Sequence, residues 1–519
     1  MSAPRSGTAS ESETPRFGRA EVPPANEMQS PSATEDTAGR PPFARGAVRA
    51  IAALLVVVLL VAAGGYGYHR DELYFLAAAR HPAWGYVDQG PLTPLFARLA
   101  TAVAGDSLVG LRVLPALFMG LLVVVTALLA REFGGHRGAQ VLAAGCVAVS
   151  AIVLQTGHLL STTTFDLLAW AVVAWLAVRA LPTGGPRWLL VGLAAGIGLQ
   201  NKVLVALLLF GLLVGLVVAG PRRPLRDPWF WGAGLLAVAL WTPYLVWQAL
   251  HGWPQLALSR SIAAGGSTSS EPWWLVVPFQ VVLVSPLLVP VWVAGLVALW
   301  RSRRYRLFPV AYAVLVVLVM ATGGKPYYLC GLYPVLLAAG AAPVLRWARA
   351  GRARAGLLGG ALVLSALTNV VLMLPVVPVA ELKDTPVTAM VADVGETVGW
   401  PELTSTVSGV IAAQPPGTVV LTGNYGEAGA VQRYAPGIPV VSGHNSYADW
   451  GPPPDDATTA VAVGYGPAVL RQWFASVEPA AVIDNGVGLD NQEQGRTVWV
   501  CRDPVANWSA LWPRIRHVG

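Results

Sequence analysis

Long runs of hydrocarbon side chains recur between Ile51 and Val377, and they restrict the fold more than any other feature of the sequence. A helix needs about 20 mostly apolar residues to cross the hydrocarbon core of a bilayer. The 519-residue chain is 55% hydrophobic and only 12% charged, whereas a soluble chain carries about 25% charged residues. The pattern therefore predicts a polytopic α-helical membrane protein.

Clusters of arginine separate the apolar runs and indicate their orientation. Cytoplasmic loops carry an excess of Lys and Arg, and placing every cluster inside gives a consistent alternation of about eleven transmembrane helices. The alternation requires two passes, or a re-entrant pair, within 188–219, because Gln200-Asn201-Lys202 interrupts that run. We expect spans near 49–65, 108–130, 138–156, 161–180, 188–219, 229–248, 273–300, 307–321, 328–345 and 356–377.

This threading divides the chain into three regions. Residues 1–45 are rich in Ser, Pro, Ala, Glu and Thr, a composition typical of a disordered cytoplasmic tail. Residues 46–377 form the predicted transmembrane domain, whose first outer loop, 66–107, is long and charged. Residues 378–519 form a predicted extracytoplasmic α/β domain. We therefore expect a multi-pass plasma-membrane protein with its N-terminus in the cytoplasm.

Short strands and helices alternate in the C-terminal region. The stretch "GNYGEAG" follows a predicted strand but lacks the G-x-G-x-x-G dinucleotide fingerprint, so we interpret it as a tight turn. The predicted strands are "TVVLTG" (418–423), "TAVAVGY" (459–465) and "AAVIDNG" (480–486), and the predicted helices are "GEAGAVQRYA" (426–435) and "PAVLRQWFASV" (467–477).

The net charge of +7 comes largely from the arginine clusters between apolar runs, which favours a role in membrane orientation over nucleic-acid binding. The three cysteines, Cys146, Cys330 and Cys501, form neither a disulfide framework nor a metal-ligand spacing. A single Cys330–Cys501 bond remains an alternative.

Ionisable residues gather directly after the first apolar run. The segment "HRDELYFLAAARH" has the spacing of an amphipathic helix lying in the membrane interface. Asp71 and Glu72 would be partly desolvated there, which raises the pKa of a carboxyl group. Such a carboxylate can accept a proton from a hydroxyl. From these residues alone, the charged face of an ordinary interfacial helix is an equally good interpretation.

The stretch "YHRDELYFLAAARHPAWGYVDQGPLTPLFARL" resembles the first outer loop of glycosyltransferase family 39, which includes the protein O-mannosyltransferases. The stretches "STTTFDLLAW", "GLQNKVLVALLLFG" and "GKPYYLCGLYPVLLAAGA" agree in the same order, and "GNYGEAGAVQRY" with "SGHNSYADWGPP" resembles bacterial relatives. The resemblance implies a GT-C fold with its active site on the outer face. There an inverting transferase would move a sugar from a polyprenyl-phosphate donor to a hydroxyl acceptor.

The resemblance also implies roles for three carboxylates. Asp71 matches the catalytic base, Glu72 lies beside it, and Asp88 is a second carboxylate that contacts the acceptor or simply caps a turn. Relatives often read "DHPPL" where this chain reads "DQGPL", so Gln89, which cannot carry charge, replaces that histidine and Gly90 replaces the first proline. The three carboxylates could assemble a divalent-cation site, although no ligand spacing requires one.

Two lysines lie at membrane depth, where an ionisable side chain usually has a function. The residues predicted to bind the donor phosphate are Lys325, Lys202 and Arg260, and those predicted to line the substrate cleft are Tyr327, Tyr328 and His81. Lys202 could instead snorkel to the interface, and the tyrosines could be interfacial anchors. Asp166 is expected to pair with a cation such as Lys202 and hold the bundle together.

The predicted partners are the polyprenyl-phosphate sugar, membrane lipids and an acceptor that is a protein, a lipid or a polysaccharide. A transporter or lipid flippase is the main alternative, but it would more often show internal repeats with broken helices in matching halves. A structural membrane subunit with an inactive site is a second alternative.

Overall fold

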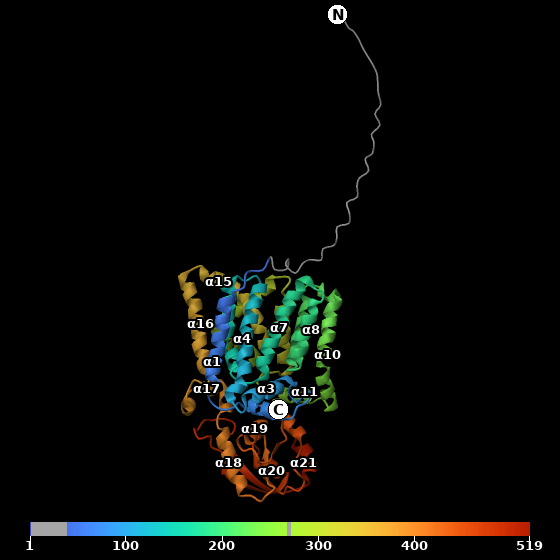
Figure 1. Cartoon of the computed structure of the whole chain (residues 1–519), viewed down its shortest axis with the longest axis vertical. Coiled ribbons are helices and arrows are strands. Elements are labelled where there is room, and N and C mark those ends of the chain that lie inside the picture. Colours follow the sequence, from blue (N-terminus) through green and yellow to red (C-terminus); the bar gives the residue numbers. More distant parts are fainter. Residues whose placement is uncertain (2–38, 267–270) are drawn as a thin grey trace, which may run out of the picture. The chain divides into compact units, whose positions relative to one another are not determined.

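The computed structural model describes residues 1, 39–266 and 271–519. Pro41–Gly519 forms one compact unit, with long helices at one end and a small sheet at the other (Figure 1). Most of the predicted tail, residues 2–38, lies outside the described residues. The end of the predicted tail is packed, because Arg131 Nε donates to the Pro41 carbonyl at 2.7 Å and the Gln140 amide bonds Pro42 and Ala44.

In the described part of the chain, six helical segments are long and apolar enough to cross a bilayer, or up to eight spans if each of two bent pairs is one. The six are α1 (Arg45–Ala62), α4 (Leu108–Glu132), α7 (Thr162–Thr183), α10 (Pro228–Leu250), η5 (Pro326–Leu332) with α15 (Tyr333–Arg349), and α16 (Arg352–Met373). The bent pairs are α5 (Arg137–Ala148) with α6 (Ala151–Gly157), and η3 (Trp273–Leu275) and α12 (Val276–Val284) with η4 (Pro286–Leu288) and α13 (Val289–Arg301).

Three shorter apolar helices occupy positions where the sequence predicts spans: α8 (Arg187–Leu199), α9 (Leu204–Val218) and α14 (Leu307–Thr322). The predicted break within 188–219 is confirmed, since Asn201 separates α8 from α9 and donates its amide hydrogen to the Thr162 carbonyl. A helix of 15 residues is only about 22 Å long. The number of about eleven crossings therefore stays a prediction.

Two predicted spans bend instead of running straight. The helix expected over 273–300 turns by 85° around Ser285 and Pro286. Proline has no backbone N–H for the helix ladder, and Ser285 has a φ of 92°, which lies outside the helical region. The helix expected over 138–156 turns by 60° between α5 and α6.

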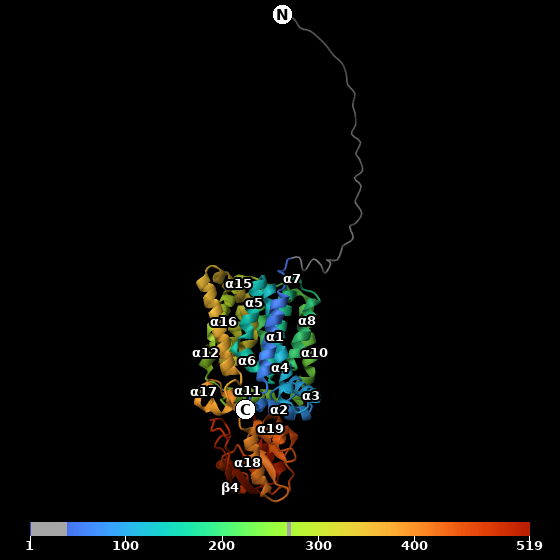
Figure 2. The same ribbon diagram turned by 60° about the vertical axis from the view of Figure 1, so that its left-hand side comes forward.

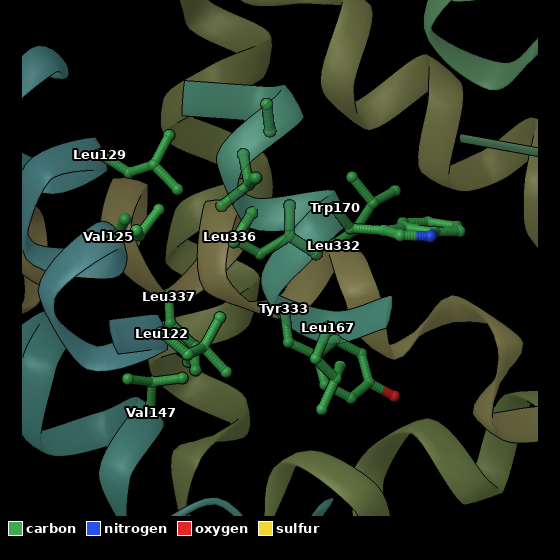
Figure 3. Close-up of a cluster of buried hydrophobic side chains, with 14 of the residues drawn as sticks. Leu122, Val125, Leu129, Val147, Leu167, Trp170, Leu332, Tyr333, Leu336 and Leu337 are labelled. Atoms are coloured by element: carbon green, nitrogen blue, oxygen red, sulfur yellow. The ribbon is translucent and has the colours of Figure 1, made fainter. Parts of the chain in front are cut away.

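The bundle is held by aliphatic and aromatic side chains from four of its helical segments. Trp170 of α7 is fully buried beside Leu332 and Tyr333 of the η5–α15 segment (Figure 3). The labelled side chains of this cluster are Leu122, Val125 and Leu129 of α4, Val147 of α5, Leu167 and Trp170 of α7, and Leu332, Tyr333, Leu336 and Leu337. None of the three cysteines is disulfide-bonded, so the Cys330–Cys501 bond is not formed.

The first loop folds into two helices, α2 (Arg70–Arg80) and α3 (Leu92–Ala104). The predicted helix over "HRDELYFLAAARH" is confirmed as α2. His69 caps its first turn by accepting from the Asp71 N–H, while the Glu72 carboxylate accepts from the His69 N–H at 2.9 Å. This reciprocal capping box satisfies amide groups that have no partner inside the helix.

The C-terminal region contains a five-stranded sheet in the order β2-β1-β3-β5-β4. β1 pairs in parallel with β2 and β3, whereas β5 runs antiparallel to β3 and β4. The strands are β1 (Val419–Thr422), β2 (Val440–Ser442), β3 (Thr459–Val463), β4 (Phe474–Val482) and β5 (Thr497–Pro504). The helices of the remaining segments are η2 (Pro224–Arg226), α11 (Pro254–Ala263), η6 (Val379–Asp384), α17 (Val387–Met390), η7 (Ala392–Thr397), α18 (Trp400–Ala412), α19 (Tyr425–Tyr434), η8 (Asn445–Trp450), α20 (Pro467–Leu470) and α21 (Trp508–Ile515).

One predicted helix of this region is wrong. The residues 467–477 begin as the short helix α20 but continue as strand β4, which also takes in the start of the predicted strand 480–486. The apolar spacing of "VLRQWF" fits a helix, but Phe474 is buried against Trp508 and β4 pairs with β5 over most of its length. Tertiary pairing therefore outweighs the local pattern.

The first loop and the C-terminal region share one hydrophobic core. Leu73 and Tyr74 of α2 pack in the same buried cluster as Trp400 of α18 and Ala428 of α19. The backbones of α2 and α19 approach closely, because a Cβ on Gly429 would lie 2.7 Å from the Leu73 Cβ. Figure 2 shows α2 and α19 next to each other, between the long helices and the sheet.

Candidate active site

The Asp71 carboxylate lies at the start of α2, on the side that faces the C-terminal region. Its Oδ1 accepts a hydrogen bond of 2.7 Å from the Tyr425 hydroxyl, at the start of α19. Burial raises the pKa of the Asp71 carboxyl, but the positive charges of His69 and Arg70, the Tyr425 hydrogen bond and Lys325 outweigh it and bring the pKa below its ordinary value. The raised pKa expected from the sequence is thus reversed, because the site surrounds the carboxylate with donors and cations.

The neighbouring Glu72 carboxylate is fully buried and bound on all sides. Arg112 forms a two-point ion pair with it, at 2.7 and 3.0 Å, and the N–H groups of His69 and Leu160 each donate at 2.9 Å. Burial raises the pKa of Glu72, but Arg112 and these donors together lower it below the usual value. A carboxylate accepts about four hydrogen bonds. Glu72 therefore holds α2 against α4 and has little capacity left for a substrate.

Asp88 accepts a hydrogen bond of 2.9 Å from the Tyr74 hydroxyl. The Tyr74 ring is stacked on the Tyr425 ring with centroids 4.7 Å apart, so a pair of tyrosines links Asp88 to Asp71. Burial raises the pKa of Asp88 to about 6, and the negative charge of Asp71 contributes to the increase. The pKa of Asp71 is thus below the ordinary value for an aspartate, whereas the pKa of Asp88 is above it.

The two lysines predicted to bind phosphate lie together near Asp71. Lys202 Nζ lies 5.3 Å from the ring centroid of Tyr327 and 5.8 Å from that of Tyr328. Burial and the positive charge of Lys202 lower the pKa of Lys325, the negative charge of Asp71 opposes them, and the resulting pKa is about 8. The structure therefore brings Lys202, Lys325 and both tyrosines into one cluster.

Lys202 does not form the expected ion pair with Asp166 among the described residues. Its Nζ donates instead to the Thr162 hydroxyl at 3.1 Å, one turn before Asp166 on α7. Asp166 is buried, and its Oδ1 has no hydrogen-bond partner in the described part of the chain.

Two other predicted residues lie apart from this cluster. Arg260 is exposed on α11, and no contact in the described ranges joins it to Lys202 or Lys325. His81 follows α2 and stacks on Trp450 with ring centroids 4.4 Å apart. It lines a cavity of about 400 Å³ with Trp247, His251 and Trp450.

The C-terminal region supplies site residues that the sequence patterns did not single out. Tyr425 belongs to "GNYGEAG", of which Gly423 and Asn424 form the turn between β1 and α19 while the rest begins the helix, and Asn424 caps α19. The Tyr425 ring packs between Tyr74 and His444. Arg70, the neighbour of Asp71, forms its ion pair with Glu396 of the C-terminal region, at 3.2 Å. The turn motif was visible in the sequence, but nothing local indicated that its tyrosine reaches Asp71.

The carboxylates do not form a metal centre in the described part of the chain. No group of three or more His, Cys, Asp or Glu side chains there is placed to hold a metal ion. The oxygens of Glu72 are taken by Arg112 and two amides, so the predicted trio of Asp71, Glu72 and Asp88 does not fit a divalent cation.

The fold matches that of proteins of known structure. The crystal structures of ArnT from Cupriavidus metallidurans, bound to undecaprenyl phosphate and in the apo state, superpose with TM-scores of 0.55 and 0.57 at 14% identity. The matches cover 87% and 88% of this chain and 97% and 98% of those chains. The chain therefore has the GT-C fold, and its long apolar helices support a multi-pass membrane protein.

The sequence comparisons match parts of the chain. Residues 88–247 match the family model described as dolichyl-phosphate-mannose-protein mannosyltransferase. Two proteins from strains of Pseudomonas fluorescens, both named undecaprenyl phosphate-alpha-4-amino-4-deoxy-L-arabinose arabinosyl transferase 1, are 31% and 28% identical over 40% and 48% of this chain. The aligned parts span 40% and 47% of those relatives. Both comparisons agree with the predicted resemblance to the protein O-mannosyltransferase-like family over these parts of the chain.

Proposed function

We propose that the protein is an inverting glycosyltransferase that moves a sugar from a polyprenyl-phosphate donor to a hydroxyl acceptor on the outer face of the membrane. The observation that carries this proposal is the arrangement of Asp71, held by Tyr425, beside the cationic cluster of Lys202 and Lys325. A base and a phosphate-binding group close together are what transfer from a phosphate-linked sugar requires.

In the proposed reaction the acceptor oxygen attacks the anomeric carbon while the bond between that carbon and the phosphate oxygen breaks. Asp71 takes the hydroxyl proton, and its low pKa keeps it ionised and ready to do so at neutral pH. The electron pair of the broken bond goes to the departing polyprenyl phosphate. Lys202 and Lys325 stabilise the negative charge on that phosphate.

Asp88 has a different role in this proposal. Its ionised form accepts a hydrogen bond from the acceptor and holds the hydroxyl toward Asp71, to which it is linked through Tyr74 and Tyr425. A second assignment makes Asp88 the base, because a pKa of about 6 lies closer to neutral pH. The two assignments are separable, since only the base should be indispensable for transfer.

The outer-face assignment rests on the distribution of arginine. Arg131, at the end of α4, contacts the residues before α1, and Arg349 lies next to Gly138 at the start of α5. These contacts gather basic residues at one end of the bundle, whereas α2 follows the other end of α1. Cytoplasmic loops carry the excess of basic residues. We therefore place the end with Asp71 and the sheet outside.

The named relatives favour an undecaprenyl-phosphate donor, with a pentose or a hexose as its sugar. The acceptor class stays open among protein, lipid and polysaccharide. Membranes with and without the protein should be supplied with a panel of radiolabelled polyprenyl-phosphate sugars. One donor should be consumed only when the protein is present, with label appearing in a single acceptor fraction. Movement of a labelled lipid across vesicles with no sugar transfer would contradict the proposal and favour a flippase.

A further inference from the structure

A basic cavity lies on the side of α2 away from Asp71. It has a volume of about 320 Å³ and is enclosed by α2, α3, α19 and the turn before α4. Apolar side chains of α2 form one wall. The polar groups that line it are Arg80, Arg98, Arg433, Thr101, Gln432 and Asp106.

The charges in this cavity do not cancel. Arg433 Nη1 forms an ion pair of 3.0 Å with Asp106, and its guanidinium lies over the Tyr68 ring. Arg80 and Arg98 are exposed, and neither forms an ion pair with any residue that the structure describes. Three arginines against one aspartate leave an excess of two positive charges, so the cavity suits an anion.

The outer surface of α3 indicates where this cavity lies in the membrane. Leu95, Leu99 and Val103 occupy one face of α3 and are 54%, 50% and 81% exposed. A helix of 13 residues is about 20 Å long, too short to cross the bilayer core of about 30 Å. An uncovered apolar face on such a helix fits the boundary between acyl chains and headgroups. Arg98 lies beside this face and can extend to the level of the lipid phosphates.

We propose that this cavity binds the phosphate-bearing headgroup of an anionic lipid of the surrounding leaflet. Arg80 of α2 and Arg98 of α3 would contact the phosphate, and Arg433 of α19 would contact it from the third side, while the acyl chains follow the exposed leucines of α3. The lipid thus joins α2 to α19 next to their close contact at Gly429. Its role is to stabilise the packing of the first loop on the C-terminal region, independently of sugar transfer.

The test uses the purified full-length chain in detergent, stripped of lipid. Thermal unfolding is followed while phosphatidylglycerol, phosphatidylcholine, uncharged diacylglycerol or inorganic phosphate is added. Phosphatidylglycerol should raise the melting temperature most, and the concentration needed should rise about fivefold for each of Arg80→Gln and Arg98→Gln. The matched control, Arg304→Gln, removes an exposed arginine that follows α13 and should respond like the unchanged protein.

Two further measurements keep the test decisive if a glutamine variant is unstable or if the cavity binds a different anion. The charge-conserving variant Arg80→Lys/Arg98→Lys should keep most of the response. Before lipid is stripped, mass spectrometry should detect more bound phosphatidylglycerol in the wild type than in the variant Arg80→Gln/Arg98→Gln. The proposal is overturned if inorganic phosphate at the same concentration stabilises as well as phosphatidylglycerol. An equal response of Arg80→Gln, Arg98→Gln and Arg304→Gln, or equal amounts of co-purified lipid, also overturns it.

Discussion

The hydroxyl of Tyr425 donates to the carboxylate of Asp71 across 2.7 Å, although the two residues are 354 positions apart. Because of this contact, the candidate active site contains residues from both the first loop and the C-terminal region. It also fixes the direction of the carboxylate, because the Tyr425 ring is held between two other rings. The proposed base is therefore positioned by tertiary structure and not by α2 alone.

Replacing Tyr425 by Phe should lower sugar transfer about tenfold while the protein stays folded. The ring stack is kept, but Asp71 loses a hydrogen bond of the kind worth about 1.5–3 kcal/mol to a charged group. The matched control is Tyr434→Phe, which removes a hydroxyl from the other end of α19. Initial rates with a saturating donor check the prediction, and equal rates for the two variants would show that the hydrogen bond has no role in transfer.

Replacing Glu72 by Gln should lower the free energy of unfolding, whereas replacing Asp71 by Asn should leave it nearly unchanged. The variant leaves Arg112 buried without its counter-charge, and breaking a buried pair costs about 3–5 kcal/mol. Asp71→Asn keeps a hydrogen-bond acceptor for Tyr425 and should unfold near the wild-type temperature. Thermal unfolding in detergent measures both. A Glu72→Gln variant as stable as the wild type but inactive would instead give Glu72 the catalytic role that the sequence suggested.

The pKa of Asp88 predicts two opposite effects of pH. Transfer should rise as pH increases through about 6, where Asp88 ionises, and Asp88→Asn should abolish this rise but keep residual transfer. The free energy of unfolding should change in the other direction. Between pH 3.8, the ordinary pKa, and about pH 6, Asp88 keeps its proton in the folded protein but has lost it in the unfolded chain. The stabilising contribution of this group is therefore lost as pH rises through that window.

Rate profiles and melting temperatures of the wild type and Asp88→Asn between pH 4 and pH 8 test both effects. A rise in rate near pH 6 that survives in Asp88→Asn would assign it to another group. Complete loss of transfer in Asp88→Asn, with Asp71→Asn still active, would make Asp88 the base.

Lys325 predicts how donor binding depends on pH. Its pKa of about 8 means that the ammonium loses its proton as pH rises through that value, so the KM for the donor should increase above pH 8. Lys325→Arg should keep binding constant to higher pH, because arginine stays charged. Lys325→Met should raise KM at every pH. An unchanged KM in Lys325→Met would remove this residue from the phosphate site.

The sequence predicts the parts of this protein that depend on local pattern. The apolar runs locate the long helices, the break at Asn201 separates two helices, and "HRDELYFLAAARH" forms α2. The lysines could be identified because charge at membrane depth is costly. The packing of the helices in the bundle brings Lys202 close to Tyr327 and Tyr328, and the sequence pattern does not predict this contact.

Properties that depend on distant contacts could not be predicted. Glu72 and Asp71 are adjacent in the chain, yet Arg112 turns the first into a buried anchor and Tyr425 keeps the second directed at the site. The direction of the Asp71 pKa follows from cations and donors around it, some of them brought by other elements. Strand β4 replaces a helical pattern because β5 lies beside it.

The most direct test of the central claim compares Asp71→Asn with Asp456→Asn, which changes an exposed aspartate of the C-terminal region. Both variants should be purified, shown to be folded, and given the radiolabelled donor that the wild type consumes. We predict that Asp71→Asn loses transfer by a factor on the order of 1000, as expected for a lost general base, while Asp456→Asn keeps the wild-type rate. Transfer by Asp71→Asn within a few-fold of the wild-type rate would contradict the account.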